Sequence, residues 1–137
     1  MNYLVALAAV ALAGSTMGAS AAPAMSGEDQ ISKAISGRVE GKPTDCLYQR
    51  DIRSTRIIDR TAILYEMNNG TIYVNRPASG ASFLNSNYAL VTNTHSSQLC
   101  SIDIVRLYDF VSRFEAGSIG LGPFVPYQRP GRVRGRR

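Results

Sequence analysis

The sequence predicts an all-β domain, a small curled sheet or barrel, preceded by a short N-terminal helix and a cleaved signal peptide. Two observations favour this fold class. Short runs rich in β-branched residues are separated by Gly, Pro and Asn, which is typical of strands joined by tight turns. Two such runs, within residues 61–76, flank Asn69-Gly70, a strong hairpin signal.

The first residues have the pattern of a secretory signal peptide. Leu4–Ala13 is apolar, no charged side chain precedes Glu28, and small residues follow at 19–22. This pattern predicts cleavage after Ala21, with Ala22-Pro23-Ala24 as a second acceptable site. The apolar run is shorter than the ~20 residues that a helix needs to span a bilayer. We therefore expect an exported protein of the periplasm or extracellular space.

After the predicted signal peptide (1–21), the chain divides into three parts. These are a flexible leader with a short helix (22–43), a β-rich domain (44–126) and a disordered arginine-rich tail (127–137). The helix is predicted at Glu28–Ser36, with Ser26 or Gly27 near its cap, because acidic residues occupy the first turn. Ile31 and Ile35 lie one turn apart and give it an apolar side.

The hairpin register follows from the turn type. Asn69 and Gly70 suit the two positive-φ positions of a type I′ turn, so a two-residue loop pairs Met67 with Ile72. One face then carries Ile63, Tyr65, Met67, Ile72 and Val74, and the other carries Leu64, Glu66, Tyr73 and Asn75. A three-residue loop pairs Met67 with Thr71 and mixes the two faces, so the two-residue loop is preferred.

Other strands are predicted from β-branched content. A strand within Thr44–Asp59 leads into a turn at Asp59-Arg60, and the adjacent Ile57 and Ile58 indicate a bulge or corner. The remaining expectations are a loop at 77–82, a strand at Tyr88–Thr92, a polar loop at Asn93–Gln98 and a terminal strand at Ile119–Val125, bent at its glycines.

The segment Leu99–Phe114 fits two interpretations. Its β-branched content suits a strand. A helix is the alternative, because five apolar residues share one helical face and Ser101 and Gly117 suit its caps. These five are Ile104, Leu107, Tyr108, Val111 and Phe114. The composition favours the strand.

The two cysteines, Cys46 and Cys100, predict a disulfide. In an oxidising compartment an even pair is most simply bridged. The alternative, a redox-active pair, lacks the Cys-x-x-Cys spacing that tunes such sites. The bridge closes a loop that contains the hairpin.

The positive charge of the chain is confined to its end. All ten Asp and Glu lie within 28–128, together with ten of the fifteen Lys and Arg, so this body is formally neutral. The net charge of +5 comes from Arg129, Arg132, Arg134, Arg136 and Arg137. Such a tail predicts contact with anionic lipid or another polyanion. The alternative is a solvated end that contributes only solubility.

Several short blocks occur together in this chain. They are Cys46-Leu47, Ile52–Asp59, Tyr73–Pro77, Leu99-Cys-x-x-Asp103-Ile-Val and Leu121-Gly-x-Phe-Val-Pro126. With these blocks the chain resembles, over roughly residues 40–128, a family of small exported proteobacterial proteins that form a domain of unknown function. The resemblance implies an exported, cysteine-containing, β-rich domain and carries over no catalytic or binding residue.

One departure from that family concerns cysteines. Similar sequences have a second pair, near Ala81–Ser82 and near Ile119, and both members are missing here. The resemblance thus implies a bridge lost as a unit, which leaves Cys46 and Cys100 as the surviving partners.

No constellation of catalytic residues is evident. The sole histidine, His95, lies in a polar loop without an orienting acid nearby, so an exposed loop residue is expected. A Cys100–His95 dyad is the alternative and requires a free thiol. Asp59 is expected to bond its own turn, and Asp103 to pair with an arginine such as Arg53 or Arg106. No metal site or cofactor is predicted.

The sequence favours a non-enzymatic exported domain with a structural or binding role in the bacterial envelope. The alternative is a small periplasmic enzyme, hydrolase-like, whose residues meet only in three dimensions. Its candidates are Asp51, Asp59, His95, Asp103, Asp109 and the arginines.

Overall fold

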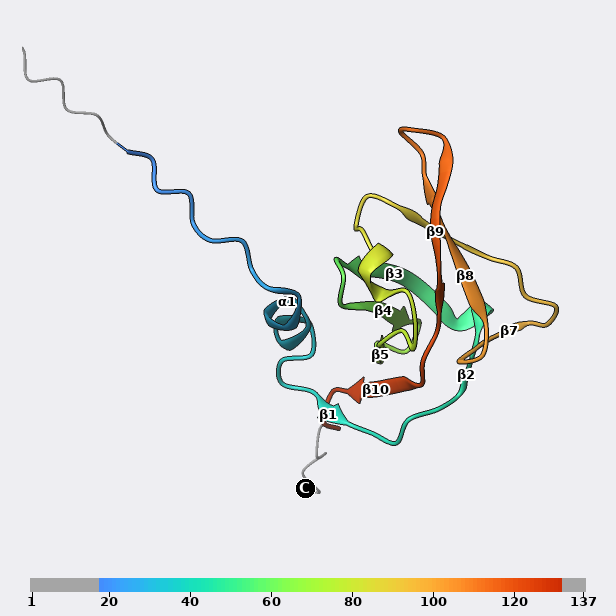
Figure 1. The fold of residues 1–137 in the computed structure, drawn as a ribbon. Helices are drawn as coiled ribbons and strands as arrows, with labels where there is room; N and C mark the ends of the chain where they lie inside the picture. Colours follow the sequence, from blue (N-terminus) through green and yellow to red (C-terminus); the bar gives the residue numbers. More distant parts are fainter. Residues whose placement is uncertain (1–17, 132–137) are drawn as a thin grey trace, which may run out of the picture.

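The computed structural model describes residues 18–131 and is mostly β (Figure 1). The described residues form one α-helix, two short 3-10 helices and ten strands. Their bounds are α1 Gly27–Ala34, β1 Val39–Glu40, β2 Cys46–Tyr48, η1 Gln49–Asp51, β3 Ile52–Ile58, β4 Ala62–Met67, β5 Ile72–Asn75, η2 Ala81–Phe83, β6 Ala89–Thr92, β7 Gln98–Cys100, β8 Ile104–Asp109, β9 Phe114–Gly120 and β10 Phe124–Gln128. This confirms the all-β class with a short N-terminal helix.

The strands form three antiparallel sheets. The largest has the order β1-β10-β5-β4-β3, the second has the order β6-β8-β9, and the third consists of β2 and β7. The sheets curl around a common core and do not close into a barrel, so the curled sheet is the correct form of the prediction. The β8–β9 hairpin projects from the body, and the C-terminal strand β10 lies near its opposite end (Figure 1).

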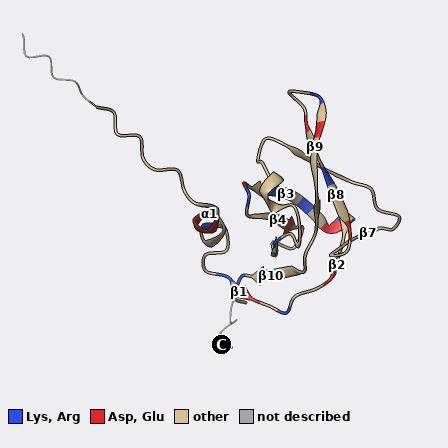
Figure 2. Cartoon of the chain, in the orientation of Figure 1, with Lys and Arg blue, Asp and Glu red and all other residues tan. Residues whose placement is uncertain are grey.

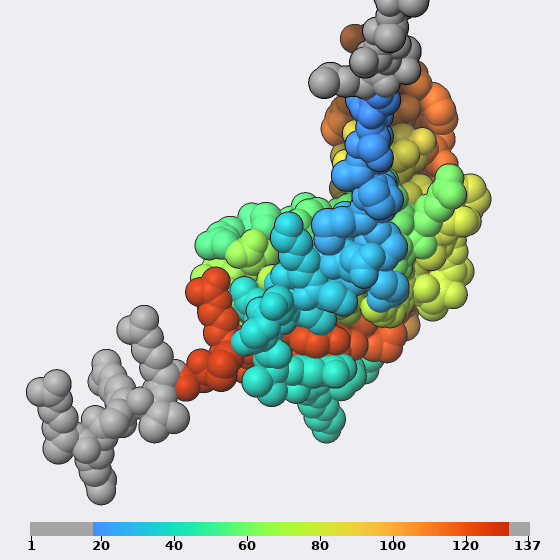
Figure 3. All heavy atoms as spheres, turned by 90° about the vertical axis from the view of Figure 1, so that its left-hand side faces the viewer, coloured from blue at the N-terminus to red at the C-terminus, as the bar shows by residue number. Residues whose placement is uncertain are grey.

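Helix α1 forms for the reasons seen in the sequence. Ser26 caps it by accepting a hydrogen bond from the Asp29 backbone N–H at 3.1 Å. Ile31 is the buried residue of the helix, and Figure 3 shows the helix lying on the surface of the body. The Arg76 guanidinium donates two hydrogen bonds to the Glu28 carboxylate, at 2.6 and 2.9 Å, which lowers the pKa of that carboxyl. The helix is therefore held by its apolar side and by this ion pair.

Strand β4 is buried on both faces. Ile63, Tyr65 and Met67 belong to the main core. Ala62 and Leu64 belong to a second cluster beneath α1. The main core also contains Leu47, Ile57, Leu84, Leu99, Val105, Leu107, Ile119, Leu121 and Phe124, and the second cluster contains Ile31, Ile58 and Val74. Nearly every residue of β4 is therefore shielded from water.

The hairpin register predicted from the sequence is wrong by one residue. Leu64 pairs with Val74 and Glu66 with Ile72, so the loop has three residues. The Gly70 N–H donates to the Met67 carbonyl at 2.9 Å, and Gly70 has φ +86°. This is a type I turn followed by a left-handed residue.

The register differs from the prediction because helix α1 covers the second face of the β4–β5 hairpin. The prediction chose the register that gathers the apolar residues on one face, whereas the helix provides an apolar cover for the other face as well. Val74 and Ile72 consequently pack with Leu64 beneath α1, and Tyr73 packs against the main core. The five predicted core residues are buried or half-buried, but they do not share one face.

Two further details of β3 and its turn differ from expectation. Ile57 and Ile58 cause no bulge, because one faces the main core and the other the helix cluster. The register shift instead lies between Ile52 and Ser54. The predicted turn at Asp59-Arg60 is present, and Arg60 adopts φ +54° within it.

The segment Leu99–Phe114 is extended, as its composition indicated. It contains the end of β7, all of β8 and the first residue of β9. The predicted terminal strand is interrupted at Leu121–Pro123, between β9 and β10. Asn75, which is fully buried, holds this bend by donating to the Gly122 carbonyl (2.6 Å) and accepting from the Gly122 N–H (3.1 Å).

The predicted tail begins two residues too early. Strand β10 runs to Gln128, since Tyr127 and Gln128 pair with Glu40 and Val39 of β1. Pro126 stands within this strand, opposite Tyr73. The leader thus supplies a short strand that the sequence did not reveal.

The predicted disulfide is present. Cys46 of β2 and Cys100 of β7 are directly opposite each other in the register, with their Cα atoms 4.0 Å apart. Their separation of 54 residues encloses β3 to β6. The bridge therefore closes a loop around the central hairpin.

Substitutions in the hairpin loop test its register. We expect Gly70→Ala to lower the free energy of unfolding by roughly 1–2 kcal/mol, because Ala is strained at positive φ. Asn69→Ala costs less, about 0.5–1 kcal/mol, since Asn69 is not left-handed and loses one hydrogen bond to the Thr71 N–H. Urea unfolding measures both, with Gly131→Ala as the control in open space. Equal costs at positions 69 and 70 would contradict the three-residue loop and support the type I′ turn predicted from the sequence.

Removal of the disulfide tests the closed loop. We expect reduction, or the double substitution of Cys46 and Cys100 by Ser, to lower the free energy of unfolding by about 4 kcal/mol through greater denatured-state entropy. Chemical denaturation with and without reductant gives the difference. The mass of the non-reduced protein should lie two hydrogens below that of the reduced form. Two free thiols would contradict the bridge.

Candidate functional site

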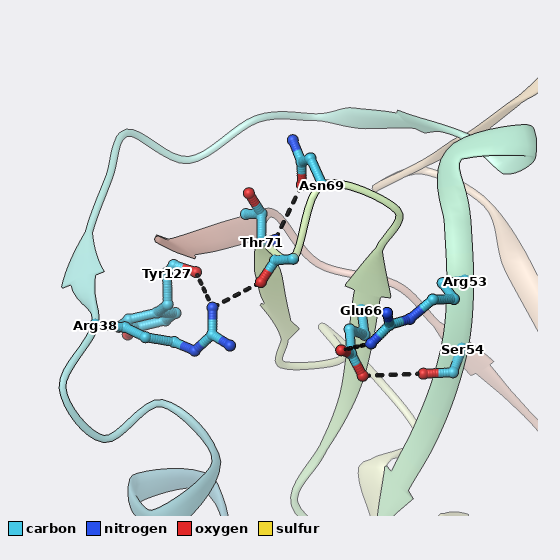
Figure 4. A network of polar contacts seen from close by, with 8 residues as sticks. Arg38, Arg53, Ser54, Glu66, Asn69, Thr71 and Tyr127 are labelled. Atoms are coloured by element: carbon cyan, nitrogen blue, oxygen red, sulfur yellow. Dashed lines mark hydrogen bonds and ion pairs between the residues drawn. The ribbon is translucent and has the colours of Figure 1, made fainter. Parts of the chain in front are cut away.

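A polar cleft of about 470 Å³ lies beside the β4–β5 loop. It is bounded by β3, by the loop itself and by the end of β10. Its lining residues are Arg53, Glu66, Asn68, Asn69, Gly70, Thr71, Gln128 and Arg129. Three segments far apart in the sequence therefore meet here, and Figure 4 shows most of the contacts that hold them.

The one carboxylate among the lining residues is engaged. Glu66 forms an ion pair with Arg53, and its second oxygen accepts a hydrogen bond from the Ser54 hydroxyl at 3.3 Å (Figure 4). Arg53 and Glu66 are both partly exposed, so solvent screens this pair. The pair neutralises the β3–β4 wall of the cleft.

Arg38, which is not among the lining residues, links the β4–β5 loop to strand β10. Its Nη1 donates to the Gly70 carbonyl at 2.7 Å and to the Tyr127 carbonyl at 3.4 Å (Figure 4). Within residues 18–131, neither Arg38 nor Arg129 forms an ion pair. Two positive charges at this end of the molecule are thus not balanced by a contacting carboxylate of the described chain.

The free donors of the cleft suit an anion. Arg129 is exposed at the rim, immediately after β10 ends, and the side-chain amides of Asn69 and Gln128 lie on the same lining. A guanidinium only donates hydrogen bonds, and the NH₂ groups of the two amides can donate beside it, which suits phosphate or carboxylate oxygens. No described nucleophile and base face each other in this lining.

The arginines predicted to bind anions divide into two groups. Arg129 lies at the cleft rim. Arg132, Arg134, Arg136 and Arg137 lie outside the described residues, as does most of the predicted signal peptide, residues 1–17. On the described body, basic and acidic side chains are spread over several elements (Figure 2).

The residues considered for catalysis lie apart. His95 is exposed in the loop between β6 and β7, as expected. Asp59 accepts from the Ser86 N–H at 2.5 Å, so its prediction as a residue bonding its own turn is wrong. Asp103 accepts from the Cys100 N–H at 2.7 Å, and neither expected arginine pairs with it, because Arg53 pairs with Glu66 and Arg106 with Glu115. These carboxylates serve loops and turns.

Other features that carry chemistry were also located. Among residues 18–131, no group of three or more His, Cys, Asp or Glu is placed to hold a metal. Burial raises the pKa of Tyr65, whose hydroxyl has no hydrogen-bond partner in the described structure. In the same range, no helix has the length and hydrophobicity needed to cross a bilayer.

Comparison with protein-family models, curated proteins and solved structures finds no match to this chain. The resemblance to the exported proteobacterial family therefore stays a prediction. The function has to be argued from the residues themselves.

Sequence reasoning identified Arg129 and missed the rest of the cleft. Arg38 gave no signal, since it stands alone between the helix and β1. Arg53 was one of two arginines expected as partners of Asp103, whereas its partner is Glu66 on the neighbouring strand β4. The pairing of Arg53 with Glu66 could be deduced only from the register between β3 and β4. A register shift between Ile52 and Ser54 changes that register next to Arg53, and the sequence did not reveal it there.

Arg38 can be tested as the link between the hairpin loop and β10. We expect Arg38→Met to lower the free energy of unfolding by about 1–3 kcal/mol, because two carbonyls lose a charged donor. Arg53→Met, which breaks only a partly exposed ion pair, should cost about 0–1 kcal/mol. Thermal or urea unfolding compares the two. Equal effects would mean that Arg38 does not hold the loop.

Proposed function

We propose that this chain is an exported, non-enzymatic β-domain with a structural or binding role in the bacterial envelope. Its arginine-rich C-terminal tail contacts anionic surfaces. The observation that carries the proposal is the position of Arg129. It follows the last residue of β10 at the rim of a cleft that offers its guanidinium and the amide groups of Asn69 and Gln128.

The distribution of charge supports this role for the tail. Residues 28–128 carry equal numbers of acidic and basic side chains, so the body itself has no long-range preference for anions. The five arginines from Arg129 onward supply the entire net charge of +5. Attraction to a polyanion should therefore depend on these residues.

The chemistry favours phosphate-bearing ligands. Guanidinium groups bind phosphate through paired hydrogen bonds as well as charge. Anionic lipid headgroups and free polyanions share this chemistry. The tail has Gly, Pro and Val between its arginines and no aromatic residue after Tyr127, so stacking on nucleic acid bases is a weak contribution.

The arrangement of the acids supports a binding role over hydrolysis. A glycosidase requires two carboxyl groups roughly 5–10 Å apart across a substrate cleft. Here Asp59, Asp103 and Asp109 each accept hydrogen bonds from backbone N–H groups of separate loops. The polar cleft contains a single carboxylate, Glu66, which Arg53 neutralises.

Vesicle binding tests the tail. We compare the chain from Ala22 to Arg137 with one that ends at Gln128, the last residue of β10, on vesicles with and without anionic lipid. The longer chain should bind anionic vesicles on the order of 1,000-fold more tightly at low salt, since it carries five more arginines and each one near the surface contributes about 1 kcal/mol. The difference should vanish at high salt.

Two further measurements make this test sharper. Replacement of all five arginines by Lys should preserve most of the binding, and replacement by Gln should abolish it. A soluble polyanion added as competitor distinguishes a lipid surface from a free polyanion as the preferred ligand. Equal binding by the full and shortened chains would refute the role of the tail.

A further inference from the structure

The turn of the β8–β9 hairpin exposes large apolar side chains to solvent. Phe110 is 67% exposed, Val111 is 90% exposed and Phe114 is 53% exposed. All three lie within residues 110–114, which comprise the turn after β8 and the first residue of β9. The hairpin projects from the body (Figure 1). A packed core does not account for these residues, so their exposure needs another explanation.

The turn is ordered by its own contacts. The Asp109 carboxylate accepts hydrogen bonds from the backbone N–H groups of Val111 (2.8 Å) and Ser112 (3.3 Å). Tyr108 and Phe110 pack edge to face, with their ring centroids 5.2 Å apart. The exposed side chains therefore stand on a turn whose leading amides already have partners. Moving such a turn out of water therefore costs less free energy than moving a turn whose backbone N–H groups have no hydrogen-bond partner.

The size and shape of this surface favour a bilayer over a protein. Three partly exposed side chains present roughly 300–400 Å², taking 150–250 Å² for a whole aromatic side chain. A stable protein complex buries about 800 Å² on each partner and needs a complementary surface. A lipid interface needs no such complementarity, and a protruding turn reaches it without contact from the rest of the domain.

Charged groups surround the apolar residues without net charge. Arg106 and Glu115 form an ion pair of 3.3 Å on the two strands, and Asp109 and Arg113 flank the turn. Hydrogen bonds from Ser112 and Val111 lower the pKa of Asp109, so this carboxyl stays ionised. A ring of charges limits insertion to the level of the headgroups.

We propose that the β8–β9 turn is a membrane-anchoring loop that places Phe110, Val111 and Phe114 in the interfacial region of a phospholipid bilayer. The site is distinct from the arginine tail. It acts by burial of apolar area and not by net charge, and it lies toward the opposite end of the domain from β10 (Figure 1). Its contribution should therefore persist on neutral lipid at high salt, where binding by the tail is screened.

Tryptophan fluorescence tests this placement directly, because the chain contains no Trp. Val111→Trp is compared with Ile102→Trp in the chain from Ala22 to Arg137. Ile102 is a matched control, because it is 88% exposed and precedes the start of β8, at the end of that strand away from the turn. With phosphatidylcholine vesicles at high salt, emission of the Val111→Trp variant should shift to shorter wavelength. Emission of the Ile102→Trp variant should stay unchanged.

A second pair of variants measures affinity. Val111→Asp should weaken binding to the same vesicles on the order of 10-fold or more, because a charge then replaces the apolar side chain that enters the lipid interface. Ile102→Asp should leave binding unchanged. Both positions are exposed, so both variants should keep the unfolding midpoint of the parent chain.

Three results would overturn the proposal. The first is the absence of any shift with lipid. The second is an equal shift at positions 102 and 111, which would indicate general adsorption. The third is a lipid-independent shift that grows with protein concentration and accompanies a dimer in sedimentation, which would make a second copy the occupant. Failure of the tail experiment leaves this test intact, since high salt and neutral lipid suppress the arginines.

Discussion

Burial of strand β4 on both faces is the constraint on which the rest of the fold depends. A strand with two apolar faces is stable only when something covers each of them. One face is covered by β6 to β9 and by Phe124 of β10, whose ring packs edge to face on Tyr65 at 5.5 Å. The other is covered by α1 through Ile31. The helix, although only eight residues long, is therefore part of the core and not an appendage.

The same constraint explains which features the sequence predicted and which it did not. Local signals sufficed for the helix, because Ser26 and the acids of its first turn act over one turn of chain. The strands of the central hairpin and the disulfide were likewise accessible from composition and spacing. The register failed because it was chosen to gather the apolar residues on one face, whereas the docked helix also buries Leu64 on the other.

The candidate site was less accessible than the fold. Its cleft is lined by residues of β3, of the β4–β5 loop and of the end of β10. No local sequence pattern predicts that these segments come together. Arg129 was found because a run of arginines is visible in any sequence. Arg38 was not, because its partners are backbone carbonyls of Gly70 and Tyr127, which every residue possesses. The exposed turn at Phe110–Phe114 was hidden by an ambiguity between strand and helix, since the helical alternative placed Val111 and Phe114 on a buried side.

The position of β10 within the large sheet has a consequence for the order of events in the life of the chain. This strand is the last in sequence, yet it lies between β1 and β5 and carries the fully buried Phe124. Until it arrives, β5 has an open edge and the main core lacks one of its largest side chains. A nascent chain that emerges from its N-terminus therefore cannot complete this sheet until β10 has been made, and strands β2 to β9 all precede it.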